Sequence, residues 1–190
     1  MVSAWVHDLE PVNECYPHTG ERVDLKFLEK LGIRHFYVDA NNVHLDREFQ
    51  EICRQNSWKQ RDLIVITPNI PNADSKLKSF FEEHMHPDEE VRAVLDGSGF
   101  FDVRVPNSDD RWIRILVEKG DCISLPGGIY HRFTLDVHGY LKCIRLHRLE
   151  VKYELVPRKS LEEKRHTVKE ASAVRESYVQ HYIKPAASAV

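Results

Sequence analysis

Two histidine-bearing segments have the residue types and the spacing of a metal site. His84, His86 and Glu90 share parity, so in β structure their side chains project from one face. A His-x-His pair on a helix would instead point to nearly opposite sides. The second segment, Pro126–His131, ends in another histidine. Three imidazoles and one carboxylate bind a divalent transition metal ion and leave coordination positions open for other ligands.

The donor types favour iron, nickel, manganese or copper over structural zinc. Structural zinc sites are closed, tetrahedral and usually built from cysteine. The four cysteines form no C-x-x-C pair, and we expect reduced, mostly buried thiols at Cys15, Cys53, Cys122 and Cys143. Four protein ligands on an octahedral ion leave two adjacent positions, which is enough for a bidentate substrate.

A run of short strands is expected to position these side chains. Turn signals recur about every eight to twelve residues from residue 62 on, which predicts an all-β sandwich or barrel core over 62–150. Residues 96–99, Asp-Gly-Ser-Gly, predict a β-hairpin turn because their glycines permit positive φ. The strands expected here are 63–67, 91–95, 100–105, 112–117, 122–125, 131–135 and 142–149.

Helices are expected on both sides of this core. Apolar residues at helical spacing predict a mostly helical lead-in over 1–60, with helices at 24–32 and 44–55 around a short strand at 35–38, and a further helix at 75–81. After Pro157 the chain is highly charged, which predicts one exposed helix over 158–184 and a loose tail. We therefore expect a domain over 1–157 and a helical extension over 158–190.

Composition excludes several classes of function. The chain has 190 residues, 42% of them hydrophobic and 30% charged, which is ordinary for a globular protein. The formal net charge of −3 gives no basic field for a nucleic acid. The longest apolar runs are too short to cross a membrane, and the first residues lack the features of a secretory signal. We expect neither a nucleic-acid nor a membrane partner.

The two metal-binding segments resemble the two motifs of the cupin superfamily, G-x5-H-x-H-x3-E-x6-G and G-x5-P-x-G-x2-H-x3-N. Lys78 stands in place of the first glycine and Leu135 in place of the final asparagine, and neither position is a metal ligand. The resemblance implies a mainly β fold, the double-stranded β-barrel or jelly roll, with the helical segments appended. It also implies that His84, His86, Glu90 and His131 bind the metal.

A closer resemblance is to the acireductone dioxygenase family. It covers about residues 5–149, is densest from 76 to 135, and is carried by the segments 80–92, 95–104, 112–114, 118–121, 125–126 and 128–133. It implies oxidation of 1,2-dihydroxy-3-keto-5-methylthiopentene by O2 in methionine salvage. The products would be 4-methylthio-2-oxobutanoate and formate with Fe(II), or 3-methylthiopropionate, formate and CO with Ni(II). One ion per chain, a monomer, and a cytoplasmic location, also nuclear in eukaryotes, are expected.

The resemblance also implies roles for three residues near the ligands. Arg92 shares the parity of Glu90 and would orient the substrate and counter its enolate charge. The competing interpretation of Arg92 is a surface residue paired with nearby carboxylates. Phe80 and Phe133 would form aromatic walls around the methylthio chain, or simply pack in the core.

Two further interpretations of the whole chain stay open at this point. The first is a metal-binding cupin with a regulatory or interaction role instead of catalysis. The second is a different cupin enzyme, such as another dioxygenase that cleaves rings or diketones, or a manganese oxalate enzyme. The complete ligand set and Arg92 disfavour the first, and the segments 95–104 and 129–133 disfavour the second.

Overall fold

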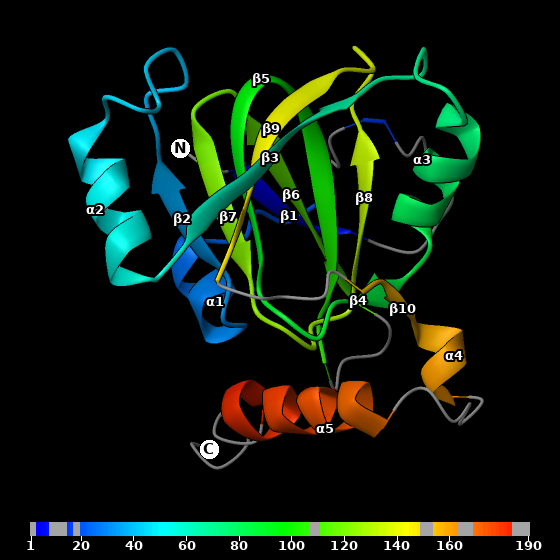
Figure 1. Cartoon of the computed structure of the whole chain (residues 1–190). Coiled ribbons are helices and arrows are strands. Elements are labelled where there is room, and N and C mark those ends of the chain that lie inside the picture. Colours follow the sequence, from blue (N-terminus) through cyan, green and yellow to red (C-terminus); the bar gives the residue numbers. More distant parts are fainter. Residues whose placement is uncertain are drawn as a thin grey trace.

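Two antiparallel sheets pack together in the computed structural model of this chain, which describes residues 3–7, 15–16, 20–106, 111–148, 154–162 and 169–183 (Figure 1). The first sheet has the order β1 (Ser3–His7), β6 (Trp112–Glu118), β5 (Glu90–Arg104), β8 (His131–Leu135), β4 (His84–Met85) and β10 (Val156–Pro157). The second has the order β2 (Arg34–Tyr37), β7 (Asp121–Leu125), β5, β9 (Leu141–His147) and β3 (Lys59–Ile66). The expectation of a mainly β barrel is confirmed.

The long strand β5 belongs to both sheets. Its first half, from Glu90 to Gly97, pairs with β7 and β9, and its second half, from Ser98 to Arg104, pairs with β6 and β8. The hairpin predicted at 96–99 is therefore wrong, because the chain continues there as one strand with a register shift. Gly97 instead allows the close approach of the Tyr140 backbone, because a Cβ on Gly97 would lie 2.1 Å from the Tyr140 carbonyl oxygen.

Alternation along β5 separates two apolar clusters. Val94 and Val103 face the space between the sheets, where the largest cluster lies. Val91 and Ala93 face the opposite side of the second sheet, where Phe49 covers them from a helix. Side chains of β5 thus alternate between the two faces of the sheet. Glu90 and Arg92 share the parity of Val94, so both point into the barrel.

Six helical segments surround the barrel in the described part of the chain. Asp24 and Asp46 accept hydrogen bonds from the first turns of α1 and α2 and so cap them. In Figure 1, α2 and α3 lie on opposite sides of the sheets, and α5 crosses beneath one end. The segments are α1 (Leu25–Lys30), α2 (Arg47–Gln55), α3 (Ala73–Phe81), α4 (Arg158–Glu162), α5 (Lys169–Tyr178) and the π-helix η2 (Val179–Ile183).

Two expectations about the ends of the chain need correction. Residues 1–60 are not mostly helical where they are described: β1 and β2 pair with barrel strands, and only α1 and α2 are helices. The C-terminal segment is not one exposed helix, because Tyr178 and Ile183 are buried in the same cluster as the barrel core. The highly charged composition of this segment gave no sign that these two side chains are buried. The division into a 1–157 domain and a 158–190 extension stays a prediction, and 185–190 lies outside the described residues.

The cysteines agree with the expectation of mostly buried thiols. All four cysteines are free thiols, and Cys53, Cys122 and Cys143 are buried. None of the helices in the described residues has the length and apolar character needed to span a membrane.

Candidate metal centre

Three histidine side chains meet at one end of the barrel. His84 lies in β4, His86 follows that strand directly, and His131 begins β8, opposite His84 in the sheet. All three are buried, and each offers a ring nitrogen within 4.8 Å of the others. The three predicted imidazole ligands are therefore brought together, as a metal ion requires.

The backbone that delivers them differs from the continuous β structure on which the parity argument rested. β4 ends at Met85, the chain bends at Pro87 and Asp88, and β5 begins at Glu90. The side chains converge because this bend returns the chain to the barrel.

Glu89 holds the bend in place. Its carboxylate accepts hydrogen bonds from the indole of Trp58 at 2.8 Å and the hydroxyl of Ser124 at 2.5 Å, and it pairs with Arg34 at 2.6 Å. Burial opposes ionisation of this carboxyl, but these donors outweigh it and lower its pKa. Of the acidic pair Asp88-Glu89, Asp88 is exposed and Glu89 anchors the bend.

Backbone carbonyl groups set the orientation of each ring. A carbonyl oxygen can only accept, so the Nδ1 atom beside it carries the proton and Nε2 presents a lone pair. Such carbonyl partners are typical of histidines that bind metals. The three Nδ1–O distances are 2.6 Å from His84 to Glu82, 2.6 Å from His86 to Glu154 and 3.0 Å from His131 to Ile129.

The environment keeps two of these imidazoles neutral. Burial, with the neighbouring ring of His131, lowers the pKa of His84 to about 3. Burial also lowers the pKa of His86 to about 4, although the carboxylate of Glu90 opposes that shift. Neutral imidazole is the form that binds a metal ion, so both rings are ready to bind at neutral pH.

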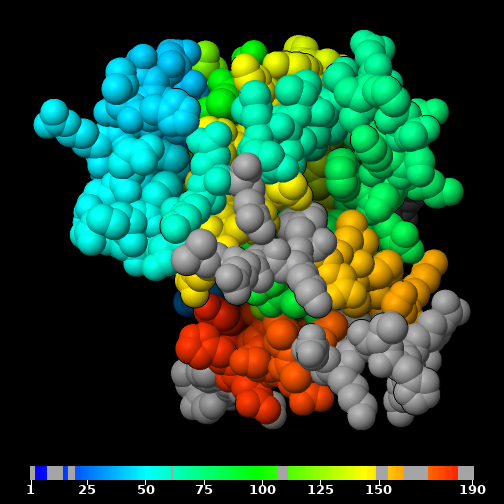
Figure 2. All heavy atoms as spheres, in the orientation of Figure 1, coloured from blue at the N-terminus to red at the C-terminus, as the bar shows by residue number. Residues whose placement is uncertain are grey.

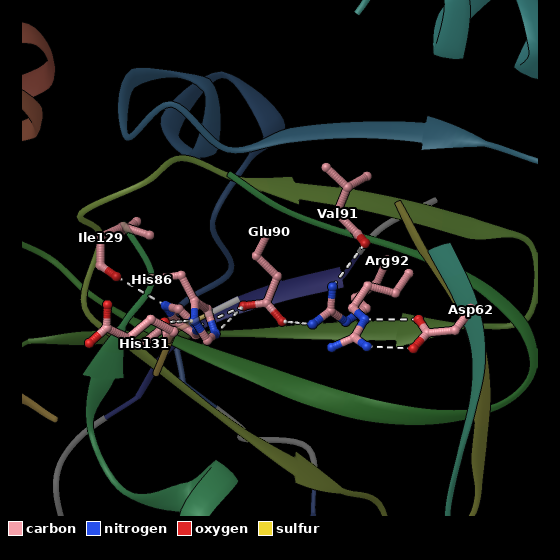
Figure 3. Close-up of polar contacts among 9 residues, drawn as sticks. Asp62, His86, Glu90, Val91, Arg92, Ile129 and His131 are labelled. Carbon is pink, nitrogen blue, oxygen red and sulfur yellow. Dashed lines mark hydrogen bonds and ion pairs between the residues drawn. The ribbon is translucent and has the colours of Figure 1, made fainter. Parts of the chain in front are cut away.

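Glu90 lies between the histidines and an arginine (Figure 3). One carboxylate oxygen, Oε2, is 2.8 Å from Nε2 of His131 and 3.5 Å from Nε2 of His86. The other, Oε1, is 2.7 Å from Nη2 of Arg92. Burial would raise the pKa of this carboxyl, but Arg92 and the histidines hold it well below its ordinary value. The carboxylate is therefore ionised.

These contacts fit a bound cation. Nδ1 of His131 faces a carbonyl and its Nε2 faces a carboxylate, so both ring nitrogens face acceptors. A neutral ring has only one N–H. A metal ion between Nε2 and the Glu90 carboxylate would satisfy both atoms. Because His84 and His86 turn neutral rings to the same point, a divalent cation satisfies all four groups.

A cavity of about 90 Å³ opens beside the histidines. His84, His131, Glu90 and Arg92 form its polar end. The rest is mainly apolar, with walls from β3, β5, β6, β8, β9, α3 and the residue before β10: Ile64, Ile66, Phe80, Val94, Phe101, Val117, Phe133, Leu141, Cys143 and Leu155. A small ligand with one polar and one apolar end matches this lining.

Each predicted pocket residue lies at this cavity. Arg92 is only 8% exposed and pairs with Glu90, not with the surface carboxylates that the competing interpretation required. Phe80 is half-buried, and Phe133 is buried with its ring 5.1 Å from that of Phe101. These positions agree with the predicted roles.

Not all of the residues that line the cavity were predicted from the sequence, and Phe101 and Arg145 are two that were missed. Phe101 follows the glycine-containing segment of β5, and Arg145 lies on β9 with its guanidinium bonded to Asp62. A signal for Arg145 exists: Leu141, Cys143 and Arg145 alternate along one strand, as inward-facing residues must. The backbone carbonyl of Glu154 at His86 had no such signal, because a carbonyl has no residue type.

Comparison with known proteins identifies relatives of this chain. The model of the ARD/ARD' family matches residues 4–154. Acireductone dioxygenase 3 of Physcomitrium patens is 46% identical over 150 residues, which cover 77% of this chain and 73% of that protein. Acireductone dioxygenase of Homo sapiens is 45% identical over 150 residues, covering 77% of this chain and 83% of that protein.

A solved structure supports the fold. Acireductone dioxygenase from Bacillus anthracis, which has a cadmium ion in its active centre, aligns with a TM-score of 0.66 over 82% of this chain and 98% of its own. At 23% identity this likeness concerns the fold, and it agrees with the cupin barrel expected from the motifs. The family model spans residues 4–154, and the two relatives are 46% and 45% identical over 77% of this chain; the chain therefore belongs to the ARD/ARD' family of acireductone dioxygenases.

Proposed function

We propose that the protein is an acireductone dioxygenase of methionine salvage. It oxidises 1,2-dihydroxy-3-keto-5-methylthiopentene with O2 to 4-methylthio-2-oxobutanoate and formate. The observation that carries this proposal is the polar end of the cavity, where three imidazoles, Glu90 and Arg92 meet beside an apolar wall. Relatives of 45% and 46% identity with that name support it.

His84, His86, Glu90 and His131 would hold one divalent ion per chain. Imidazole and carboxylate ligands suit Fe(II), with Ni(II) as the alternative. With Ni(II) the products would be 3-methylthiopropionate, formate and CO. When bound, the ion supplies a Lewis acid and a template for the chelating oxygens of the substrate.

The charges of the site match an enediolate. Glu90 carries one negative charge and Arg92 one positive charge, and they offset each other in direct contact. With His84 and His86 neutral, a divalent ion gives the site two net positive charges. A doubly deprotonated acireductone would neutralise them, which favours this substrate over a neutral one in a buried site.

Arg92 and the aromatic side chains would position the substrate. Arg92 presents a planar guanidinium at the polar end of the cavity, where it can donate to the enolate oxygens. Phe80 and Phe133 line the apolar part, together with Phe101, and fit a methylthio chain. These walls also exclude water from the oxygens that carry the charge.

The remaining parts of the proposal concern partners and location. The substrate and O2 are small molecules, and the net charge of −3 supports the absence of a nucleic-acid partner. We propose a monomer in the cytoplasm, with the nucleus as a second location in a eukaryote; the family resemblance supports the location.

Oxygen consumption by the Fe(II)-loaded protein on freshly generated acireductone tests the proposal. The expected result is O2 uptake with formate and the keto acid in equal amounts, and CO when Ni(II) replaces Fe(II). The metal-free protein is the control, and it should consume no more O2 than buffer. A metal-loaded protein without uptake would contradict the proposal and favour a binding role or another substrate.

A further inference from the structure

The C-terminal helices touch the backbone around the metal ligands. They lie beyond residue 154, where the match to the family model ends. In Figure 2 these orange and red segments form the lower end of the molecule, against the barrel. Their contacts converge on the residues that precede two of the histidines, Glu83 before His84 and Tyr130 before His131.

The first contact comes from the start of α4. β10 pairs with β4, which places Pro157 opposite His84. The backbone N–H of Arg158 then donates to the Glu83 carbonyl at 3.0 Å, and its guanidinium donates to the Glu83 carboxylate at 3.1 Å. The same carboxylate pairs with Arg104 of β5 at 2.5 Å. The strand of His84 is therefore held from both sides.

The second contact comes from Arg175 in the middle of α5. Its Nη1 donates to the Gly128 carbonyl at 2.9 Å, and its guanidinium carbon lies 4.3 Å from the centre of the Tyr130 ring. A guanidinium stacked on an aromatic ring interacts favourably with it. Arg175 thus contacts both ends of the Gly128–Tyr130 turn, which leads into His131.

That turn also carries the link to His86. The N–H of Gly128 donates to the His86 carbonyl at 2.9 Å. A Cβ on Gly128 would lie 3.0 Å from both the Val174 carbonyl and the Tyr178 Cβ, so α5 packs directly on this glycine, whose φ is +85°. One side of Gly128 is bonded to a ligand residue and the other is covered by α5.

We propose that Arg175 is a positioning residue for the metal centre: by fixing the Gly128–Tyr130 turn, it sets the position of His131 relative to His86. Arg158 supports His84 in the same way through Glu83. The inference rests on the metal site of the proposed function, and it adds a C-terminal element outside the shared family region. Neighbours that orient ligands typically change metal affinity by about 10- to 100-fold when they are removed.

Arg175→Met tests this, because methionine retains the apolar stem but removes both the donor and the charge. We expect weaker affinity for Co(II), by about 10- to 100-fold, in competition with a chelator. We also expect an altered visible spectrum of the Co(II) protein. In the Fe(II) enzyme kcat should fall more than KM rises, and Arg175→Lys should recover part of the affinity.

Tyr178→Phe is the matched control on the same helix. The Tyr178 hydroxyl donates to the Leu31 carbonyl at 3.1 Å, away from the histidine turn. Its removal should lower the melting temperature of the metal-free protein without changing Co(II) affinity or spectrum. If Arg175→Met binds Co(II) as the unchanged protein does, or if both variants weaken binding equally, the positioning role is wrong.

The metal readout separates this inference from the proposed function. A protein that binds Co(II) but does not oxidise acireductone would contradict the function and leave the effect of Arg175 on affinity measurable. An active enzyme whose affinity is indifferent to Arg175 would contradict the inference alone.

Discussion

Arg92 is ion-paired with Glu90 at 2.7 Å, although both side chains lie on one strand and both are less than a tenth exposed. The two residues stand two positions apart in β5, so the pleat directs both into the cavity. The guanidinium therefore has two tasks: it keeps the carboxylate ionised beside the histidines, and it lines the polar end of the cavity, while its Nη1 donates to the Val91 carbonyl at 3.0 Å.

Arg92→Met should remove both contributions, and activity and stability measurements report on them separately. Losing an oriented donor to a developing negative charge typically costs about 10²- to 10³-fold in kcat, and we expect a loss of this size in O2 uptake. The metal-free variant should also be destabilised by about 3–5 kcal/mol, since the buried Glu90 charge loses its partner. Metal content should stay near one ion per chain. Wild-type kinetics would place Arg92 outside the reaction.

His86→Ala should abolish metal binding and O2 uptake together. The ring contributes one of three convergent nitrogens, and its alanine replacement leaves an incomplete set of ligands. Metal analysis after dialysis and O2 uptake measure the two effects. His138→Ala is the control, because His138 is an exposed residue outside both motifs and should alter neither. Turnover by His86→Ala with bound metal would contradict the site.

The candidate metal centre could be predicted from sequence because metal ions demand particular residue types. The four candidate ligands have those residue types, at spacings that seldom occur together for another reason: His84, His86, Glu90 and His131. Arg145 was within reach of the same reasoning, since its alternation along β9 places it in the cavity.

Other features depend on contacts between residues distant in the chain. The Asp96–Gly99 segment has the composition of a hairpin turn, yet its conformation follows from the close approach of Tyr140. The helix α5 reads as a charged surface helix, but Tyr178 bonds to Leu31, 147 positions earlier. Local sequence cannot contain such information, because it is supplied only when the chain is folded.

Gly97→Ala should therefore be among the most destabilising single changes in the barrel. Gly97 has a φ of +72°, and the new methyl group would lie 2.1 Å from a backbone oxygen that cannot move independently. Left-handed backbone costs a non-glycine residue about 1–2 kcal/mol, and the steric clash adds to this cost. We expect a loss above about 3 kcal/mol in chemical denaturation.

Gly120→Ala provides the comparison for Gly97→Ala. Gly120 has a φ of +95°, but the nearest atom to its added Cβ is 3.6 Å away, which is ordinary contact. The free energy of unfolding should therefore fall only by the cost of the backbone strain, about 1–2 kcal/mol. Equal destabilisation by both substitutions would show that the approach of Tyr140 to β5 is not needed for the fold.

The metal-free protein should lose stability as the pH falls below about 6.5. The folded pKa values of His84 and His86, about 3 and about 4, lie below the ordinary value of 6.5. Between these limits the unfolded chain binds protons that the folded chain excludes. The free energy of unfolding therefore decreases with falling pH, by up to about 1.4 kcal/mol per pH unit for each imidazole.

Thermal unfolding of the metal-free protein from pH 7 to pH 4 measures this dependence, and two variants isolate its source. His86→Gln removes one of the buried titrating groups, so the slope of the free energy of unfolding against pH should become shallower. His44→Gln removes an exposed histidine and should leave the slope unchanged. If His86→Gln retains the full slope, the acid sensitivity arises elsewhere, and the buried imidazoles are not held neutral by the folded barrel.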